Sequence, residues 1–547
     1  MKKYIVVLLL FGSVGGYSQT KQATSFTPPL NIPLTLSGNF GELRPNHFHG
    51  GLDFKTQNVI GKKVLAVADG YISRILVTHG SGYMLYVHYN NGYTTICRHL
   101  SGFLLPMAER VEDYQYKQES WEVTIVPDST EYPIHAGQQI AWSGSTGYSF
   151  GPHLHLDLIE NATGDHVNPL PFFKSFIKDN RPPKADGIML FPQAGKGVVE
   201  GNQRERTFLP NAVRPIEAWG WIGAGIKAYD YMTGTSNRYG VHSVALFVDG
   251  KEIFRSTVDR YSTDENRMVN SWAYGSYMKS FIDPGNTLRM LHAENGNRGL
   301  IDIDEEREYH FMYELKDLYG NTSHYRFVVR GKRQPIQPLI HREKYLLAWD
   351  KMNFLQEPGM TLVIPKGTLY EDLPLHFNVR ADSGAIAYTY QLNDKPVPLH
   401  AACELSIGLR HKWLADTTKY YVAEITSGGR MHSVGGKYEK GFMKANILDL
   451  GTYTVAIDTV PPKVLPLAKN TWARSGRIAY RIKDAETGIR SYRGTIDGKY
   501  ALFGWEMMTN RLVCKIDPRR VAKSGRHVVE VTVTDNCGNV RVVKDTF

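Results

Sequence analysis

Residues 151–158 read GPHLHLDL, and polar and apolar side chains alternate without a break after the Gly-Pro turn signal. His153, His155 and Asp157 fall on one side, and the three leucines fall on the other. This period of two is typical of a half-buried β-strand, so the leucines are expected to face a core. The other face carries two imidazoles and a carboxylate, although Thr, Lys or Ser would serve equally well on a solvent-exposed strand face. This choice of residues indicates a catalytic or metal-binding role.

Length and composition predict a multidomain all-β protein. The chain has 547 residues, far more than one core usually serves, so about three to five domains are expected. Hydrophobic content of 42% and charged content of 22% are ordinary globular values. Aromatic content of 12%, with 51 Gly and 27 Pro, favours strands and turns over helices.

The N-terminus is expected to be a secretory signal peptide covering residues 1–18. Lys2 and Lys3 form a charged region, Ile5 to Phe11 form a short apolar run, and small residues follow up to about Ser18. The apolar run is too short to span a bilayer. No cysteine lies near the cleavage position to carry a lipid anchor, and no later transmembrane segment is evident. The mature protein is therefore expected to be exported, and to be periplasmic or secreted.

The formal net charge of +10 is spread along the chain without a basic run. Such a distribution suits a polyanionic cell envelope and does not favour nucleic acid as a partner.

The four cysteines do not suggest a thiolate metal site, because no CxxC spacing occurs. In an oxidising compartment Cys514 and Cys537, both in the last domain, are candidates to pair. Cys97 is interpreted as a small packing residue and not a nucleophile, since no base-and-orienter pair is identifiable for it.

Two proline-marked joints divide the chain, NRPPKADGI at 180–188 and DTVPPKVLP at 458–466. The strong chemical signals all precede the first joint. The expected order is a peptidase domain at 19–178, an immunoglobulin-like β-sandwich at 179–334, a β-rich domain at 335–457 and a second immunoglobulin-like sandwich at 458–547. The later domains are interpreted as structural or binding modules.

A weak internal repeat follows the two joints. Each copy has an Asp-turn-Gly, then an Asp-Gly hairpin turn, then a closing Asp-x-x-Gly-Asn turn before a final strand. The first copy shows them at Asp230 with Gly234, VDGK at 248–251 and DLYGN at 317–321, and the second at Asp484 with Gly488, IDGK at 496–499 and DNCGN at 535–539.

Two further segments carry candidate site residues. In NHFHGGLDF (46–54), glycines between His49 and Asp53 permit a tight backbone path that brings both side chains onto one metal. In YVHYNNGYTTICRHL (86–100), Asn91-Gly92 predicts a hairpin. A two-residue loop would place His88 and His99 on one face of that ribbon. The alternative for either histidine is a hydrogen-bonded structural role.

Together these segments supply one carboxylate and several imidazoles, a donor set that suits a catalytic zinc ion with three protein ligands. His49, Asp53 and one histidine of the pair His153 and His155 would make that set. No HExxH motif occurs, so another group must handle protons, and a spare histidine suits this because its pKa ordinarily lies near neutrality.

HGGLD, the hairpin ending in RHL, and SGSTGYSFGPHLHLDL resemble the lysostaphin/LytM-type zinc metalloendopeptidases of peptidoglycan. GKKVLAVADGYISRI (61–75) matches another segment of that family in style, and the resemblance covers roughly residues 35–165. It implies a small antiparallel β domain, of the duplicated hybrid motif type, with a groove over the sheet.

The resemblance implies that His49, Asp53 and His155 bind Zn²⁺ and that His99 and His153 are the catalytic histidines. These two would activate the water or stabilise the oxyanion. Asp157 is a candidate for a hydrogen bond to a metal ligand. The implied substrate is the cross-linking peptide of peptidoglycan, and a Gram-negative envelope would favour D,D-endopeptidase action over cleavage of glycine bridges.

The segment at residues 102–135 departs from the family pattern, because it is longer than expected by roughly twenty residues. Long inserted loops often have a function. This insertion either walls or covers the groove, or is a surface insertion without a role.

The runner-up function is a non-catalytic relative that binds cell wall or activates another hydrolase. The presence of all five site residues favours the enzyme. A third possibility makes the sandwich domains the main function, as an adhesin or a scaffold.

Overall fold

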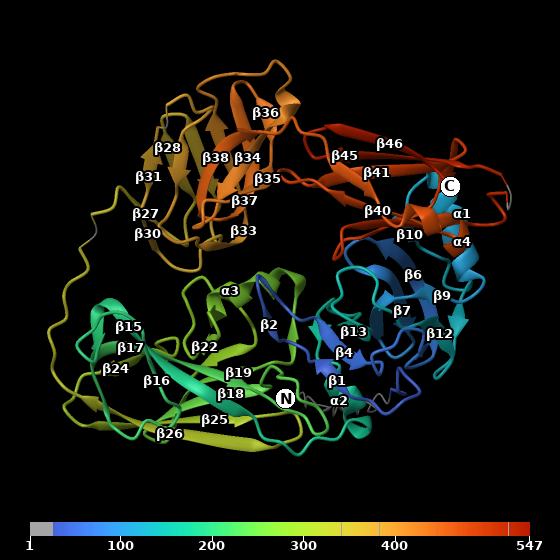
Figure 1. Ribbon diagram of the computed structural model, residues 1–547. Helices are drawn as coiled ribbons and strands as arrows, with labels where there is room; N and C mark the ends of the chain where they lie inside the picture. The colour runs from blue at the N-terminus through green and yellow to red at the C-terminus, as the bar shows by residue number, and fades with distance from the viewer. Residues whose placement is uncertain (1–25, 341, 382, 523–524) are drawn as a thin grey trace, which may run out of the picture.

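The computed structural model describes residues 26–340, 342–381, 383–522 and 525–547, and the expected signal peptide lies outside them. The predicted all-β fold is confirmed (Figure 1). Within the described residues the α-helices are α1 (Met107–Gln118), α2 (Leu170–Phe173), α3 (Val269–Trp272) and α4 (Trp472–Ser475). None of the described helices is long and apolar enough to cross a membrane.

The sheet that carries the candidate site is antiparallel and is built around the opening strand. Its order is β1 (Leu36–Gly38), β4 (Gly51–Lys55), β13 (His153–Glu160), β8 (Tyr93–Leu100), β7 (Gly82–Tyr89), β6 (Gly70–Thr78) and β10 (Val123–Ile125). The three leucines of β13 are at most 1% exposed and belong to the core beneath this sheet. The alternation of GPHLHLDL thus anchors β13 by one face and leaves the other face for chemistry.

The hairpin of β7 and β8 has a register different from the one expected. His88 lies opposite Thr94, one position away from the pairing that a two-residue loop would give. His88 contacts Thr94, Asn161 and Tyr71. Its side chain lies on the face of the sheet opposite the core residues Leu85 and Val87. A β-bulge brings the His99 ring to this same face, so the two histidines share a face as expected, several residues apart, although the loop is one residue longer than expected.

The residues after the first joint form one continuous hydrogen-bonded sheet around a large apolar core. Its main strands are β16 (Arg206–Phe208), β15 (Lys184–Val199), β17 (Ile216–Tyr229), β26 (Thr322–Gly331), β25 (Glu308–Lys316), β18 (Ser243–Val248), β19 (Lys251–Thr257) and β23 (Leu291–Ala293). β17 pairs with β26 in parallel, whereas the other neighbours in this order pair antiparallel.

Two five-stranded sheets follow. One is β28 (Asn353–Glu357), β29 (Met360–Ile364), β33 (Pro398–Gly408), β37 (Phe442–Asp449) and β36 (Lys437–Glu439); the other is β31 (Asn378–Arg380), β32 (Thr389–Gln391), β38 (Thr452–Ile457), β34 (Tyr420–Ile425) and β35 (Met431–Gly435).

Two four-stranded sheets form the last part. They are β39 (Lys463–Pro466), β40 (Arg477–Lys483), β44 (Arg511–Lys515) and β43 (Phe503–Glu506), and β42 (Lys499–Ala501), β41 (Ile489–Ile496), β45 (Val528–Asp535) and β46 (Val540–Thr546). These two sheets, at residues 463–547, are called the C-terminal sandwich below. The earlier sheet and its core, at residues 184–331, are called the first sandwich.

The internal repeat has the same local geometry in both copies. The Asp-Gly turns place Asp249 and Asp497 at a φ of 51° each, as a tight hairpin requires. In the closing turns, Asp317 accepts both the backbone and side-chain N–H of Asn321, and Asp535 does the same for Asn539.

All four cysteines are buried free thiols, so the candidate pairing of Cys514 with Cys537 does not form. Burial raises the pKa of the Cys97 thiol to about 12, which agrees with its interpretation as a packing residue.

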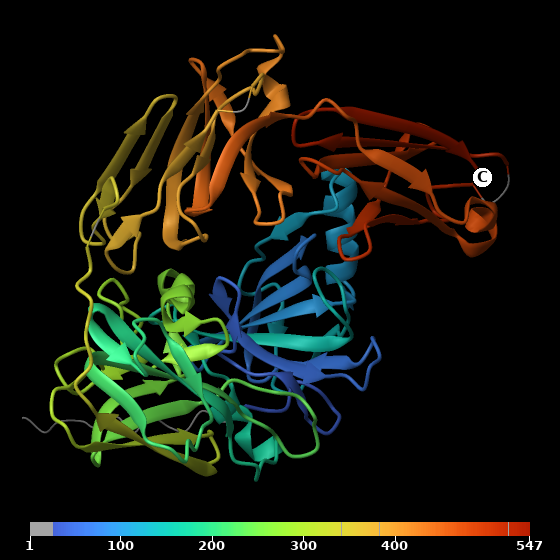
Figure 2. The same ribbon diagram turned by 60° about the vertical axis from the view of Figure 1, so that its left-hand side comes forward.

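The insertion at 102–135 carries α1 and β10, and β10 extends the sheet by pairing with β6. The C-terminal sandwich lies against α1, although the two are separated by more than 300 residues in the sequence (Figures 1 and 2). The insertion therefore packs against another part of the chain and is not a free surface loop.

Candidate metal centre

The candidate metal centre is built by the register between β4 and β13. Asp53 on β4 lies directly opposite His155 on β13. A Cβ at Gly51 would lie 2.1 Å from the Leu156 carbonyl oxygen, so the backbone approaches too closely there for any residue but glycine. The glycines after His49 therefore let its imidazole turn back over the same strand pair.

Three predicted ligands converge at this place. The Nε2 atom of His49 lies 3.1 Å from Nδ1 of His155 and 3.1 Å from Oδ1 of Asp53. The third side of the triangle, from His155 Nδ1 to Asp53 Oδ1, measures 2.8 Å. Donors held about 2.0–2.2 Å from one tetrahedral Zn²⁺ lie a little over 3 Å apart, so this donor set of two nitrogens and one oxygen fits zinc.

The second nitrogen of each ligand histidine is held by an acceptor. His49 donates from Nδ1 to the Asn39 carbonyl at 2.6 Å, and His155 donates from Nε2 to Asp157 Oδ1 at 2.8 Å. Arg98 donates from Nε to the other oxygen of Asp157 at 2.7 Å. These bonds fix the orientation of both rings, so that loss of one proton frees the inward-facing nitrogen of each ring to bind a metal.

Electrostatics at the centre favour a cation. Burial alone would raise the pKa of Asp53, but hydrogen bonds from His155 and His49 hold it well below its usual range. Burial would also raise the pKa of Asp157, yet His155 and Arg98 lower it strongly. Burial opposes protonation of His155, but Asp157 and Asp53 raise its pKa to about 9. The carboxylates of Asp53 and Asp157 are therefore both anionic, and their negative charge favours a cation at this place.

His99 reaches the site through a β-bulge. Arg98 and His99 together oppose a single residue of β7, and His99 has a φ of 60°. Strict alternation would place His99 on the core side with Cys97. Its left-handed conformation instead brings its ring to 5.0 Å from the ring of His153 and 6.1 Å from that of His155, measured between centroids.

The two predicted catalytic histidines are oriented by backbone carbonyls. His99 donates from Nδ1 to the Thr146 carbonyl at 2.9 Å, and His153 donates from Nδ1 to the Gly151 carbonyl at 2.8 Å. Burial lowers the pKa of His99 to about 4 despite its bond to Thr146, so the ring is neutral at pH 7. In a neutral ring that donates from Nδ1, Nε2 carries the free lone pair. The loop that precedes β13, with the sequence SGSTGYSFG, therefore orients the imidazoles of His99 and His153.

Sequence reasoning missed Arg98 and Asn39. Arg98 stands beside His99 in CRHL, but an isolated arginine on a strand carries no signal of its own. Asn39 acts through its carbonyl, an atom that every residue has, while its side chain bonds twice to the backbone of Gly240 at 2.9 Å. Only the tertiary structure identifies either residue.

The comparisons with known proteins agree with this centre. A glycyl-glycine endopeptidase of Staphylococcus capitis, ALE-1, is 32% identical over 147 residues, 26% of this chain and 32% of the relative. An uncharacterised metalloprotease of Haemophilus influenzae is 30% identical over 153 residues, 28% of this chain and 25% of the relative. The N-terminal third of this chain is homologous to the lysostaphin/LytM-type metallopeptidases. The predicted resemblance is confirmed.

A third metallopeptidase relative is the peptidoglycan DD-endopeptidase ShyB of Vibrio cholerae, 28% identical over 188 residues, 34% of this chain and 35% of the relative. This chain spans about a quarter to a third of the length of these metallopeptidase relatives. Residues 344–458, in the β-rich segment between the joints, match instead the model of a Zu5-like domain.

Proposed function

We propose that this protein is an exported zinc-dependent endopeptidase that hydrolyses the peptide cross-links of bacterial peptidoglycan. The observation that carries the proposal is the convergence of His49, Asp53 and His155 beside His99 and His153. The relatives named as peptidoglycan and glycyl-glycine endopeptidases support the substrate class. The N-terminal sequence and the envelope substrate support export.

In this proposal His49, Asp53 and His155 would hold a Zn²⁺ ion, which would supply polarisation of the scissile carbonyl and acidification of a water molecule. Asp157 and the Asn39 carbonyl keep the ligand imidazoles in the binding tautomer. Arg98 holds Asp157 in its anionic form. All of these groups lie in the same buried region, so the geometry is set before substrate binds.

The two remaining histidines handle the proton. Neutral His99 offers Nε2 as a base, because its Nδ1–H is committed to the Thr146 carbonyl. His153 lies across from it, with Nε2 at 3.6 Å from Asp53 Oδ1. One ring takes the proton of the attacking water, and the other stabilises the oxyanion of the attacked carbonyl.

The experiment is a digestion of purified peptidoglycan sacculi, followed by separation of the products by mass. Full-length protein should convert cross-linked species to uncross-linked ones. Chelator and His155→Ala should each reduce this conversion by at least about 100-fold, as loss of a catalytic metal does. Zinc added back after chelation should restore the wild type and not the variant.

The alternative, a cell-wall-binding relative without catalysis, predicts a different result. Cross-linked species would then persist with the wild type while the protein still co-sediments with sacculi, and that outcome would refute the endopeptidase. Matched synthetic peptides with a glycine bridge or a D,D cross-link identify the preferred bond.

A further inference from the structure

The inserted segment and the C-terminal sandwich form one interface. Arg493 donates to Glu119 at 2.7 Å, and Arg519 donates to Glu112 at 2.5 Å. Arg520 lies 3.5 Å above the ring of Tyr116. Apolar packing adds to these polar contacts, because a Cβ on Gly504 would come within 2.9 Å of the Trp121 ring. The insertion that departs from the family pattern is thus a docking platform.

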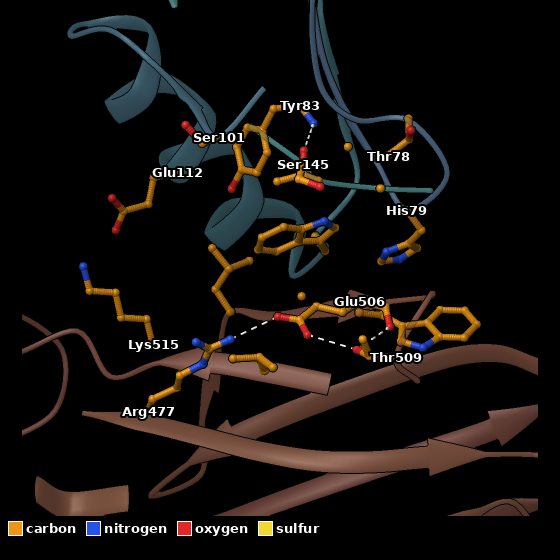
Figure 3. A pocket seen from close by; sticks show the side chains of 18 of the residues that line it. Thr78, His79, Tyr83, Ser101, Glu112, Ser145, Arg477, Glu506, Thr509 and Lys515 are labelled. Carbon is orange, nitrogen blue, oxygen red and sulfur yellow. Dashed lines mark hydrogen bonds and ion pairs between the residues drawn. The ribbon is translucent and has the colours of Figure 1, made fainter. Parts of the chain in front are cut away.

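A cavity of about 870 Å³ lies between these two parts (Figure 3). This volume is in the range of sites that take small molecules or short peptides. On the peptidase side it is lined by Ser145, Thr146, Gly147 and Ser149, and on the sandwich side by residues of β40, β43 and β44 with the turns beside them.

The cavity reaches the loop that positions the catalytic histidines. Thr146, which lines it, accepts the hydrogen bond from His99. Ser149, which also lines it, has its hydroxyl 3.4 Å from Nδ1 of His153. The five site residues do not themselves line the cavity, but the cavity and the two histidines share this loop, so the cavity adjoins the residues that orient His99 and His153.

One cationic side chain in the lining has no partner among the residues that the structure describes. Arg477 is paired with Glu506 at 3.0 Å, and Arg519 is paired with Glu112 and Asp517. The ammonium group of Lys515, at the end of β44, makes no hydrogen bond or ion pair with any residue that the structure describes. Figure 3 shows its ammonium group directed across the cavity toward the peptidase side.

We propose that the C-terminal sandwich forms one wall of a substrate subsite, in which Lys515 binds a free carboxylate of the peptide next to the scissile bond. This inference rests on the proposed function for the identity of the peptide. Peptidoglycan stem peptides carry free carboxylates, and a peptide is favoured over a sugar because the cavity shares with the proposed cleavage site the loop that orients His99 and His153. The unpaired ammonium then gains a partner on binding.

The test compares two soluble cross-linked peptide dimers. One has free stem carboxylates, and in the other the same carboxylates are amidated. Full-length wild type should show a KM about 5-fold lower for the free acid, the size expected of an exposed ion pair, with similar kcat. Lys515→Ala should remove this preference by raising KM for the free acid alone. Lys515→Arg should retain it, and Lys515→Glu should reverse it.

Lys483→Ala is the matched control, because Lys483 is an exposed lysine on β40 of the same sheet and does not line the cavity. It should behave as wild type. The proposal is overturned if wild type does not discriminate between the dimers, if Lys515→Ala raises both KM values equally, or if Lys483→Ala has the same effect.

A binding measurement separates failure of the subsite from failure of the proposed function. Chelator-treated protein is titrated with the free-acid dimer, and tryptophan fluorescence is followed because Trp121 and Trp505 line the cavity. Saturable binding that weakens about 5-fold in Lys515→Ala supports the subsite even if no dimer is hydrolysed. An affinity for the dimer that is the same in wild type and Lys515→Ala overturns the subsite even if hydrolysis proceeds.

Discussion

The two sandwiches carry the same repeated turns, yet they attach to the peptidase sheet in opposite ways. The first sandwich continues that sheet, because β14 (His166–Val167) pairs with β20 (Arg260–Tyr261). The C-terminal sandwich meets α1 through ion pairs whose side chains are largely solvent-exposed, such as Glu119 with Arg493 at 47% and 49% exposure. The first attachment resembles a domain interior, and the second resembles a surface contact.

This difference matches what each sandwich supplies to the site. Asn39, which orients the ligand His49, is itself held by Gly240 of the loop between β17 and β18. A metal ligand needs a rigid support, and buried strand pairing provides one. The proposed subsite would have to admit a bulky polymer, and a polar, screened contact would permit its wall to move.

The largest expected effect comes from breaking the first attachment. Tyr261 is 1% exposed and stacks on His166 at 5.2 Å and on Phe40 at 5.4 Å. Tyr261→Ala should lower the free energy of unfolding by about 3–5 kcal/mol, measured by denaturant titration. In the second attachment the Tyr500 ring lies 5.7 Å from the Tyr116 ring of α1, measured between centroids, and Tyr500→Ala should cost less than half as much. Equal losses would contradict the comparison.

The second prediction concerns a buried carboxyl of the first sandwich. Burial, together with Asp317 and Asp179, raises the pKa of Asp230 to about 8, although the Tyr231 N–H and Arg181 oppose this. The folded state therefore holds a proton that the unfolded state releases near pH 4, so stability should fall as pH rises from about 4 to 8.

Asp230→Asn removes this ionisation. The variant should therefore gain about 2 kcal/mol over wild type at pH 8 and little at pH 4, measured by thermal unfolding. Asp484→Asn, the counterpart in the second copy, should show no such pH-dependent gain, because its carboxylate already accepts N–H groups of residues 486–488. A gain that is the same at both pH values would contradict the assignment.

The third prediction tests whether the first sandwich supports the metal centre. Asn39→Ala removes both side-chain bonds to Gly240 and should weaken zinc binding about 10-fold, measured by competition with a chelating dye. Asn237→Ala is the control, because Asn237 bonds from the same loop to the Ser37 carbonyl and does not contact His49. Similar losses in both variants would show that the loop acts only through general stability.

The smallest expected effect concerns the second attachment. Glu119→Ala should weaken docking of the C-terminal sandwich by less than about 1 kcal/mol, and high salt should have a similar effect on wild type. Hydrogen exchange of α1 should rise in both cases while exchange at the pairing of β14 with β20 stays constant. Faster exchange at both attachments would erase the distinction between them.

Much of the candidate site is predictable from local pattern. Alternation placed His153, His155 and Asp157 on one strand face, and the glycines of HGGLD indicated a tight path beside Asp53. The choice between His153 and His155 as ligand is decided by pairing, because only His155 stands opposite Asp53. The hairpin was predicted, but its register was not, since one extra loop residue shifts the pairing by one position.

The sequence by itself determined the all-β class, the donor types of the metal centre and the strand that presents them, because these depend on residues within a few positions of one another. Tertiary structure alone decided that His99 reaches the site, that Asn39 and Arg98 support it, and that the C-terminal sandwich packs against the insertion. These outcomes depend on a bulge, on backbone atoms and on contacts between residues hundreds of positions apart. No local period encodes such contacts, and packing selects them.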